Sequence, residues 1–416
     1  MVSMKSIWYI ARKIGFGQGA GFTRFMLGLA MVSIALSITI MILANAITNG
    51  FQNQITQKIY DFWGHIHISN GYTNKFFETD QIQLEDALIE EIEALDLRSM
   101  GASGPVESIN GIIQYPVIIQ HDGVLEGAIT RSVDSTYRYD VMSRYIIDGS
   151  LDSFRREDRS VILSRSIQKR IDAQVGDQLI LYFIKDEQQF PRRFRVQAIY
   201  NTGVMEYDDK IIFVRTEDIR GILGFDPGMF TSYEISLRNN EDIELYNDYL
   251  YQHVVPSKFF NFSIEELFPN IFEWVYMQET NETLIMVLLM IVSIINMITV
   301  FFILVMEKVQ LIGLLKALGA TNQHVRRIFI LLAGRILFFG IVIGNGVALL
   351  LGFLQQKFQL ITLNEAEYYI SHVPIEFNFG FILLINGIVL IVCLVFMFLP
   401  ALVISRIRPS RTLRFA

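Results

Sequence analysis

The chain is almost without cysteine, and this absence limits how its folded parts can be stabilised. Its 416 residues include one cysteine, Cys393, which lies inside an apolar run. A disulfide within the chain is therefore excluded, so a water-exposed domain must be held together by its own hydrophobic core. No long Pro-rich or Gly/Ser-rich linker interrupts residues 50–281, which predicts that this region is one domain.

Motifs that carry catalysis are also missing. The chain has no Gly-Lys dipeptide, so it lacks a Walker A loop to hold the phosphates of ATP, and Gly-x-Ser-x-Gly is absent. His65-x-His67 places two imidazoles on one face of a strand, but the spacing suggests no third metal ligand. The acidic pairs Glu90-Glu91 and Asp208-Asp209 are interpreted as solvated surface. We therefore expect a chain that is not an enzyme, has no metal site and binds no cofactor itself.

Apolar residues and charges are both plentiful, and they are separated along the chain. With 52% hydrophobic residues and a mean hydropathy of +0.37, the chain is too apolar for a soluble protein, yet 19% charged residues is too many for one lying wholly in lipid. Residues 50–281 hold 37 of the 42 Asp and Glu residues but 21 of the 35 Lys and Arg residues. This acidic region argues against a nucleic-acid partner and predicts a large water-exposed domain on a membrane protein.

Four apolar segments are long enough to cross a membrane. A helix needs about 20 apolar residues to span roughly 30 Å of hydrocarbon. Phe25 to Ile47 carries no charge and ends in Asn-Gly, and Thr283 to Met306 is uncharged between two glutamates. The predicted organisation is a cytoplasmic segment at 1–24, a first span at 25–49, an extracytoplasmic domain at 50–281, a second span at 282–306, a cytoplasmic helix at 307–326, a third span at 327–354, a short outer loop at 355–376, a fourth span at 377–405 and a cytoplasmic tail at 406–416.

The lysines and arginines that flank the spans predict their orientation. The loop between the third and fourth spans has one basic residue, Lys357, against three glutamates, whereas the segments at 1–24, 307–327 and 406–416 are basic. The basic flanking residues are Lys5, Arg12, Lys13, Arg24, Lys308, Lys316, Arg326, Arg327, Arg406, Arg408, Arg411 and Arg414. Both termini are therefore predicted to be cytoplasmic. A cleaved leader ending near Ala44-Asn45-Ala46 is the alternative for the first span, but its apolar run exceeds the roughly 7–15 residues of a leader.

The region between the first two spans is predicted to be a mixed α/β domain. Gln83 to Leu97 has apolar residues at helical spacing with acids opposite, and Ile112 to Gln120 is predicted to be a strand. A denser passage follows, with a strand at 160–164, a helix at 165–171, a Gly176-Asp177 turn and strands at 178–183, 194–200 and 210–214. We expect one α/β domain, which an arrangement in two lobes would still satisfy.

Small and amide side chains interrupt the apolar spans. Gly340-x-x-x-Gly344, with Gly346 and Gly352 nearby, allows helix backbones to approach closely, which we interpret as helix packing. An amide in hydrocarbon is costly unless it is paired. The amides that we expect to hydrogen-bond across helices are Asn296, Asn345 and Asn386.

The segment between the second and third spans carries the clearest signal of function. Val309, Ile312, Leu315 and Leu318 repeat at three-residue spacing, which predicts a short amphipathic helix. Gly319 suits its C-cap, and Thr321 suits the N-cap of the next helix. Such a helix either lies in the lipid interface or docks into a groove on a soluble partner.

This segment also resembles a known family. Residues 305–320, Val-Met-Glu-Lys-Val-Gln-Leu-Ile-Gly-Leu-Leu-Lys-Ala-Leu-Gly-Ala, resemble the stretch after the second span of the LolC/LolE lipoprotein-releasing permeases, relatives of MacB and FtsX. Other similar segments are Asn49-Gly-Phe-Gln52, Ile294-Ile-Asn296, Ser160–Phe183, Tyr368-Tyr-Ile-Ser-His-Val-Pro374, and Pro400, Arg406, Pro409 and Leu413-Arg414 in the tail. The resemblance implies a MacB-like periplasmic core domain and an FtsX-like permease domain at 282–406.

The family resemblance also implies partners and roles. The chain is expected to be the permease of an ABC transporter that extracts lipoproteins from the bacterial inner membrane, with a separate cytoplasmic ATPase that binds ATP and Mg. The residues implied to contact that ATPase are Glu307, Lys308, Ile312, Leu315, Lys316, Leu318 and Gly319. Thr48, Phe51, Ile294 and Asn296 are assigned to a lipoprotein cavity completed by a second permease copy or homologue. In the family, an extended hairpin recruits a soluble periplasmic carrier; here Ile184 to Arg193 is short, which leaves Phe190 and Pro191 as a small hook.

Two other activities occur among such permeases. A MacB-like member would drive efflux with a periplasmic adaptor, and an FtsX-like member would transport nothing and activate a cell-wall hydrolase. The outer loop from Tyr368 to Pro374 favours lipoprotein release, because it resembles that branch of the family.

Overall fold

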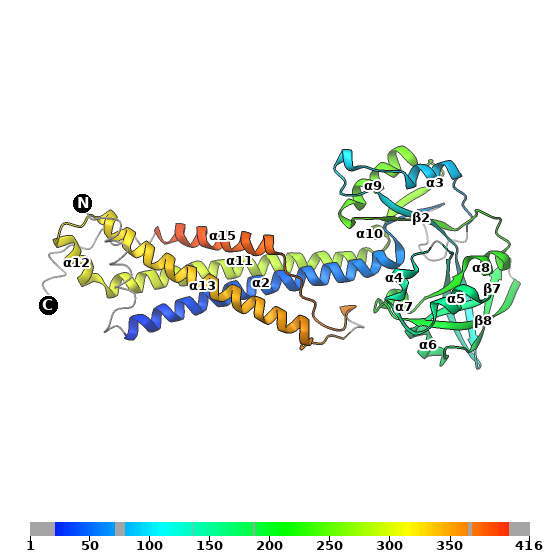
Figure 1. Ribbon diagram of the computed structural model, residues 1–416, viewed down its shortest axis with the longest axis horizontal. Coiled ribbons are helices and arrows are strands. Elements are labelled where there is room, and N and C mark those ends of the chain that lie inside the picture. The colour runs from blue at the N-terminus through cyan, green and yellow to red at the C-terminus, as the bar shows by residue number, and fades with distance from the viewer. Residues whose placement is uncertain (1–20, 71–79, 136, 186–187, 365–367, 399–416) are drawn as a thin grey trace. The chain divides into compact units, whose positions relative to one another are not determined.

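The computed structural model describes residues 21–70, 80–135, 137–185, 188–364 and 368–398, and it divides into two compact units. The helical unit comprises the chain up to Gln52, Trp274–Thr362 and the chain from His372 onward. The α/β unit comprises Asn53–Glu273 and Leu363–Ser371. The colours of Figure 1 follow the chain through both units. The chain passes from one unit to the other within two helices and again within one loop.

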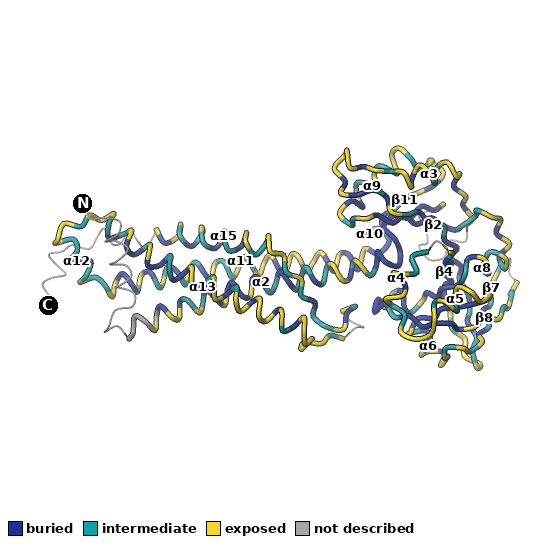
Figure 2. The backbone as a smooth tube through the Cα atoms, in the orientation of Figure 1, coloured by how far each residue is buried: buried dark blue, intermediate teal, exposed yellow. Residues whose placement is uncertain are grey.

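Among the described residues, four long helices and one short one lie wholly or partly in the helical unit. They are α2 (Gly21–Trp63), α11 (Pro269–Glu307), α12 (Val309–Ala317), α13 (Asn322–Phe358) and α15 (Phe379–Phe396). All except α12 are long and apolar enough to cross a membrane. In Figure 2 exposed residues recur along the length of these helices, and many of them are large apolar side chains. Lipid or further protein would cover such surface.

Two of these helices continue well beyond the predicted spans. α2 runs through Asn49-Gly50 to Trp63, and α11 begins at Pro269, well before Glu282. The first helix therefore continues through Asn49-Gly50, while the bounds of the membrane spans at 25–49 and 282–306 stay predictions. An apolar run measures what lies in hydrocarbon, whereas a helix propagates through backbone hydrogen bonds that polar residues also support. The predicted segments at 1–20 and 406–416, and the end of the fourth span at Ser405, lie outside the described residues.

Close packing of α2 against α13 confirms the interpretation of Gly340-x-x-x-Gly344. A Cβ atom on Gly340 would lie 2.8 Å from the Ile34 side chain, and one on Gly344 would lie 2.7 Å from the backbone oxygen of Ala35. The Thr39 hydroxyl donates to the backbone oxygen of Gly344 at 3.0 Å. The two helix backbones approach this closely because neither glycine carries a side chain.

We expect Gly344→Ala to destabilise the helical unit by about 1–3 kcal/mol, because the added methyl meets a backbone oxygen that cannot move aside without shifting a helix. Gly346 is the matched control, since nothing lies within 4 Å of a Cβ placed there. Gly346→Ala should be neutral or slightly stabilising through helix propensity. Thermal unfolding of the detergent-solubilised protein measures both, and equal midpoints for the two variants would contradict the packing assignment.

The amides within the long helices pair across helices, as predicted. Asn345 on α13 and Asn386 on α15 exchange two hydrogen bonds, at 3.0 and 2.9 Å. Asn296 on α11 donates to the hydroxyl of Ser33 on α2. The α2–α11 pair has a second link, from Asn45 to the carboxylate of Glu282 at 2.9 Å.

The first part of the α/β unit is a four-stranded antiparallel sheet in the order β11-β1-β10-β2. Its strands are β1 (Ile66–Ser69), β2 (Val106–Ile112), β10 (Ser232–Leu237) and β11 (Phe260–Ser263). The accompanying helices are α3 (Asp86–Glu93), η1 (Arg98–Met100), η2 (Asn240–Asp242), α9 (Ile243–Tyr249), η3 (Leu250–Val254) and α10 (Ile264–Leu267). The α3 helix lies within the predicted helix at 83–97.

The second part is a seven-stranded sheet that closes on itself. Its order is β5-β8-β6-β9-β4-β3-β7, and β7 pairs with β8 to complete the ring. The strands are β3 (Gln114–His121), β4 (Val124–Val133), β5 (Ile146–Gly149), β6 (Ser160–Ser164), β7 (Gln178–Lys185), β8 (Gln188–Tyr200) and β9 (Ile211–Arg215). The helices are α4 (Tyr139–Ser143), α5 (Leu151–Arg156), α6 (Arg165–Ile171), α7 (Met205–Asp208) and α8 (Thr216–Leu223). β6 and α6 have the bounds predicted from the sequence.

Alternation along the strands explains the core of this second sheet. On β7, Leu179, Leu181 and Phe183 are fully buried, while the residues between them are partly exposed. These inward side chains join those of the other strands and of α6 and α8 in one hydrophobic cluster. A period of two residues is what a sheet with one buried face requires.

Candidate functional site

The candidate site is the turn of chain that joins α11 to α13. α11 ends at Glu307, Lys308 occupies the turn, and α12 then runs from Val309 to Ala317. Gly319 has a φ of +91°, and the N–H of Ala320 donates to the Leu315 oxygen at 2.9 Å, which closes the helix. Thr321 then caps α13 through the N–H of His324. Gly319 and Thr321 therefore have the capping roles predicted for them.

The apolar residues of α12 divide between two faces. Ile312 is fully buried in the core of the helical unit, and Leu315 packs partly against that core. Leu314 is 47% exposed and Leu318 is 77% exposed. Large apolar side chains at this exposure, one helical turn apart, form a surface that a partner or a membrane would cover.

The predicted stripe at three-residue spacing is therefore partly wrong. Each step of three residues falls short of a full turn by roughly 60°, so Val309, Ile312, Leu315 and Leu318 sweep across half of the helix surface. Ile312 is buried in the helical unit, and its assigned contact with the ATPase stays a prediction. Leu314 was not among the predicted contact residues, although its spacing of four residues from Leu318 was visible in the sequence.

Charged residues lie near this exposed pair along the chain. Lys308 and Glu307 form an ion pair at 3.2 Å at the start of the turn. Lys316 is half-buried, and burial lowers the pKa of its ammonium group below the ordinary value. Lys316 is two positions away from each leucine, which on a helix places its side chain about 160° away from theirs, so Lys316 lies on another face of α12 than the exposed pair.

An open apolar groove of about 660 Å³ lies on the last turns of α11. It is lined by Ile298, Thr299, Phe302, Ile303, Met306 and Glu307. The residues predicted for the lipoprotein cavity are not among them. Ile294 is half-buried on α11, while Thr48 and Phe51 are half-buried on α2, where Phe51 meets Trp274 edge-on. Their assignment to a cavity, together with Asn296, stays a prediction.

The described residues of the segment from Ile184 to Arg193, which was predicted to be short, belong to β7 and β8. β7 and β8 remain paired to Lys185 and Gln188, with Tyr182 opposite Pro191 and Phe183 opposite Phe190. Pro191 is exposed, but Phe190 is partly buried against the hydrophobic cluster of the sheet. A protruding hook that includes Phe190 does not fit this geometry, because its ring packs inward; whether Pro191 meets a carrier stays a prediction.

The two histidines of His65-x-His67 lie just before and within β1, and both are buried. His65 bonds Asn240 at 2.9 Å and accepts the N–H of Leu237 at 3.0 Å, while His67 stacks on Phe262. Burial lowers the pKa of His65 to about 4 and that of His67 to about 3. The described residues contain no group of three or more His, Cys, Asp and Glu placed to hold a metal ion.

Acid should therefore destabilise the α/β unit through these imidazoles. Their folded-state pKa lies below the ordinary 6.5, so the stability that they contribute is present above pH 6.5 and is lost as the pH falls toward their folded values. We expect His67→Phe, which keeps an aromatic ring, to reduce the loss of stability between pH 6.5 and 5 by about 2 kcal/mol. Denaturant unfolding at both pH values measures this. His253→Phe, at an exposed position, is the control, and an unchanged pH dependence in His67→Phe would contradict the assignment.

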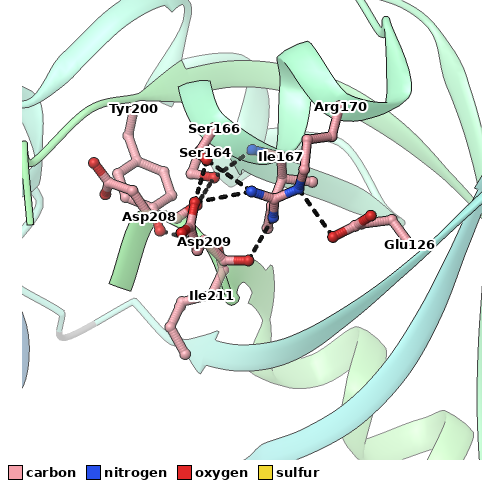
Figure 3. Close-up of polar contacts among 9 residues, drawn as sticks. All are labelled: Glu126, Ser164, Ser166, Ile167, Arg170, Tyr200, Asp208, Asp209 and Ile211. Atoms are coloured by element: carbon pink, nitrogen blue, oxygen red, sulfur yellow. Dashed lines mark hydrogen bonds and ion pairs between the residues drawn. The ribbon is translucent and has the colours of Figure 1, made fainter. Parts of the chain in front are cut away.

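The prediction that Asp208-Asp209 form solvated surface was wrong for Asp208, whereas Asp209 is partly exposed. Asp208 is 3% exposed and accepts hydrogen bonds from the backbone and hydroxyl of Thr202 and from the N–H of Gly203. Burial raises the pKa of Asp208 to about 6. Figure 3 shows the neighbouring contacts, where Asp209 meets Ser166 and Arg170, which also pairs with Glu126. This network ties α6 to the turn after α7.

The buried ion pair between Arg131 and Glu234 was not predicted from the sequence. Arg131 on β4 is 1% exposed and donates to the Glu234 carboxylate on β10 at 2.5 Å and to the Phe62 oxygen on α2 at 2.7 Å. Its guanidinium also lies 4.5 Å from the ring centre of Trp63. One side chain therefore joins both sheets to the end of α2 within the α/β unit. The available signal was a charged residue inside each of two apolar strands.

Comparison with known proteins identifies both units. The model of the MacB-like periplasmic core domain matches residues 27–250, and the model of the FtsX-like permease C-terminal region matches residues 283–409. The chain is 22% identical over 414 residues to the lipoprotein-releasing system transmembrane protein LolC of Xylella fastidiosa, covering 95% of each chain. It is 21% identical over 403 residues to the corresponding LolE of Haemophilus influenzae, covering 92% of each.

A likeness to a solved structure is weaker. The extracellular domain of the noncanonic ABC-type transporter YknZ from Gram-positive bacteria matches with a TM-score of 0.31 and 10% identity, covering 48% of this chain and 100% of that one. A score this low supports no argument. The two family models, together with relatives that match nearly the whole length, identify the family. The chain belongs to the MacB-like periplasmic core domain family, carries an FtsX-like permease segment, and resembles the LolC/LolE type.

Proposed function

We propose that this chain is the membrane subunit of an ABC transporter that releases lipoproteins from the bacterial inner membrane. Its relatives named as lipoprotein-releasing proteins match it over nearly its full length. The excess of Lys and Arg at 1–24, 307–326 and 406–416 supports cytoplasmic termini and a cytoplasmic α12, with the α/β unit in the periplasm. In this orientation four helices span the membrane.

The observation that carries the proposal is the exposed leucine pair on α12. A separate ATPase, which binds ATP and Mg, would receive Leu314 and Leu318 in a groove, as amphipathic helices are received in many complexes. Ile312 fixes the opposite face of α12 in the helical unit. A push on the leucines would therefore move α11 and α13 rather than only α12.

The energy of lipid extraction explains why such a machine needs ATP. Each buried CH₂ group contributes about 0.8 kcal/mol to membrane anchoring, so two or three acyl chains cost tens of kcal/mol to withdraw into water. A cavity between two permease copies, and then a periplasmic carrier, would replace the lost lipid contacts. The exposed apolar faces of α2 and α11 are consistent with such a cavity. ATP hydrolysis on the partner would supply direction.

Depletion of the protein tests the function directly. We expect mature lipoproteins to accumulate in the inner membrane, because their release requires this subunit. Membrane fractionation followed by lipoprotein detection measures the effect, and complementation with the parental chain is the control. Normal lipoprotein sorting after depletion would contradict a non-redundant role, whereas recovery of an efflux adaptor or a cell-wall hydrolase with the protein would favour the MacB-like or FtsX-like activity.

A further inference from the structure

The two sides of the loop between α13 and α15 are held together by hydrogen bonds. Gln355, near the end of α13, is 6% exposed, and its side-chain amide holds both sides of the loop. Nε2 donates to the oxygens of Ile361 at 3.2 Å and Val373 at 3.1 Å, and Oε1 accepts the N–H of Ile361 at 3.0 Å. Thr362 and His372 form a β-bridge beyond this point. The two sides of the loop are thus fixed to each other.

The tip of this loop belongs to the α/β unit. We call the described residues Tyr368–Ser371 the strap, and they cluster with Asn53–Glu273 rather than with the helices that the loop connects. The oxygen of Tyr369 accepts a hydrogen bond from the ammonium group of Lys58 on α2 at 2.8 Å. Ile370 is 3% exposed. A charged hydrogen bond and a buried apolar side chain therefore both hold the strap.

A glycine makes room for this contact. Gly203 has a φ of +76°, and a Cβ atom there would lie 3.0 Å from the Tyr369 oxygen and 3.2 Å from the Lys58 ammonium nitrogen. Asp208 keeps this turn rigid, because its carboxylate accepts the N–H groups of Thr202 and Gly203. Tyr369 itself has a φ of +62°, a conformation that non-glycine residues adopt only where surrounding contacts impose it. The strap therefore packs against a turn that has room for the Tyr369 oxygen and is held in place by Asp208.

We propose that the strap is a transmission element, which fastens the α13–α15 loop to Lys58 and the Gly203 turn so that motion of these helices reaches the α/β unit. This inference rests on the proposed function and adds a route to it. The units are also joined by the chain within α2 and within α11. When α13 and α15 are displaced relative to the α/β unit, the strap either pulls on Lys58 and the turn or detaches.

Gly203→Ala in the permease–ATPase complex tests the seat of the strap. The methyl group crowds the Tyr369 oxygen, so we expect hydrogen exchange of a peptide covering residues 368–373 to increase by about tenfold or more, in keeping with the loss of a charged hydrogen bond. Gly123→Ala is the matched control, because Gly123 also has a positive φ, +85°, but nothing lies within 4 Å of its Cβ position. Lys58→Met should act in the same direction, and Lys169→Met, at an exposed position, should not.

Function provides the second readout. In Gly203→Ala we expect lipoprotein release to fall at least fivefold, while ATP hydrolysis and assembly with the ATPase remain at parental levels. The proposal is wrong when exchange at 368–373 does not increase, because these contacts then do not hold the strap. It is equally wrong when exchange increases but release continues at the parental rate.

Failure of the proposed function gives a different result. The parental complex would then release no lipoprotein under any condition. In that case the strap would be tested only by the effect of ATP on hydrogen exchange. ATP must change the exchange of residues 368–373 in the parental complex and leave it unchanged in Gly203→Ala, and an equal response in both proteins would overturn the inference.

Discussion

Replacing Leu314 and Leu318 together with aspartate is expected to remove the ATPase from the purified permease. Both leucines are exposed on α12, at 47% and 77%, and neither contributes to the buried core of the helical unit. Burying a leucine side chain contributes about 1.5–3 kcal/mol, so the loss of both should weaken binding by roughly 100-fold or more. Co-purification from solubilised membranes, followed by quantification of the ATPase, measures the loss.

Two controls separate this effect from misfolding. Leu125→Asp places the same change at a position of the α/β unit that is 63% exposed, and it should leave the ATPase bound. Ile312→Ala should instead lower the thermal stability of the helical unit, because Ile312 is fully buried. Lys316→Glu combined with Leu318→Asp should act like the double leucine variant. Full co-purification of the ATPase with Leu314→Asp/Leu318→Asp would show that α12 meets lipid rather than a partner.

Arg131→Met is expected to cause the largest loss of stability of any single change in the α/β unit, about 3–5 kcal/mol. The substitution leaves the Glu234 carboxylate buried without its cation, and it removes the donor to the Phe62 oxygen at the end of α2. Burial already raises the pKa of Glu234 to about 7, so the carboxyl group should take up a proton when its partner is lost. Denaturant unfolding of the solubilised chain measures the change in the free energy of unfolding.

The double variant Arg131→Met/Glu234→Met distinguishes a broken ion pair from lost packing. Replacing both charges with apolar side chains should recover much of the stability, because the desolvation cost of both groups disappears. The exposed pair between Arg98 and Asp96 provides the control, and Arg98→Met should leave the unfolding midpoint unchanged. A double variant that is no more stable than Arg131→Met would show that the guanidinium acts through its contacts with Phe62 and Trp63 instead.

Much of the fold was predictable because it depends on local patterns. The strand at 160–164 and the helix at 165–171 were found at their observed bounds, since Ser164 both ends an apolar strand and caps the helix through the N–H of Ile167. The cross-helix amides were predictable because an amide in an apolar span has few other ways to be paired. The Ser164 cap depends on residues within one turn of helix, and the pairing of the amides follows from the cost of an unpaired amide in hydrocarbon.

The missed features depend on residues far apart in the chain. Arg131 pairs with Glu234 across two sheets, and neither strand alone shows that its charged residue faces inward toward the other. Asp208 was taken for surface because the strand and helix that cover it are distant in the chain; the hydroxyl of Ser164, which donates to the Asp208 backbone oxygen, lies 44 residues earlier. On α12 the error concerned which face of the helix is buried. A short helix beside two long ones buries the face that its neighbours cover. Ile312, which was predicted to contact the ATPase, lies on the buried face of α12, and Leu314 lies on the exposed face.

The double hydrogen bond between Asn345 and Asn386 restricts how the membrane region can rearrange. Each amide is at once donor and acceptor for the other, so a slide of α13 along α15 by one residue would break both bonds together. An amide stranded in hydrocarbon would find no water to replace its partner. These two helices should consequently move as one body during the proposed transport cycle. Any sliding or tilting that the cycle requires should occur at the interfaces between other helices.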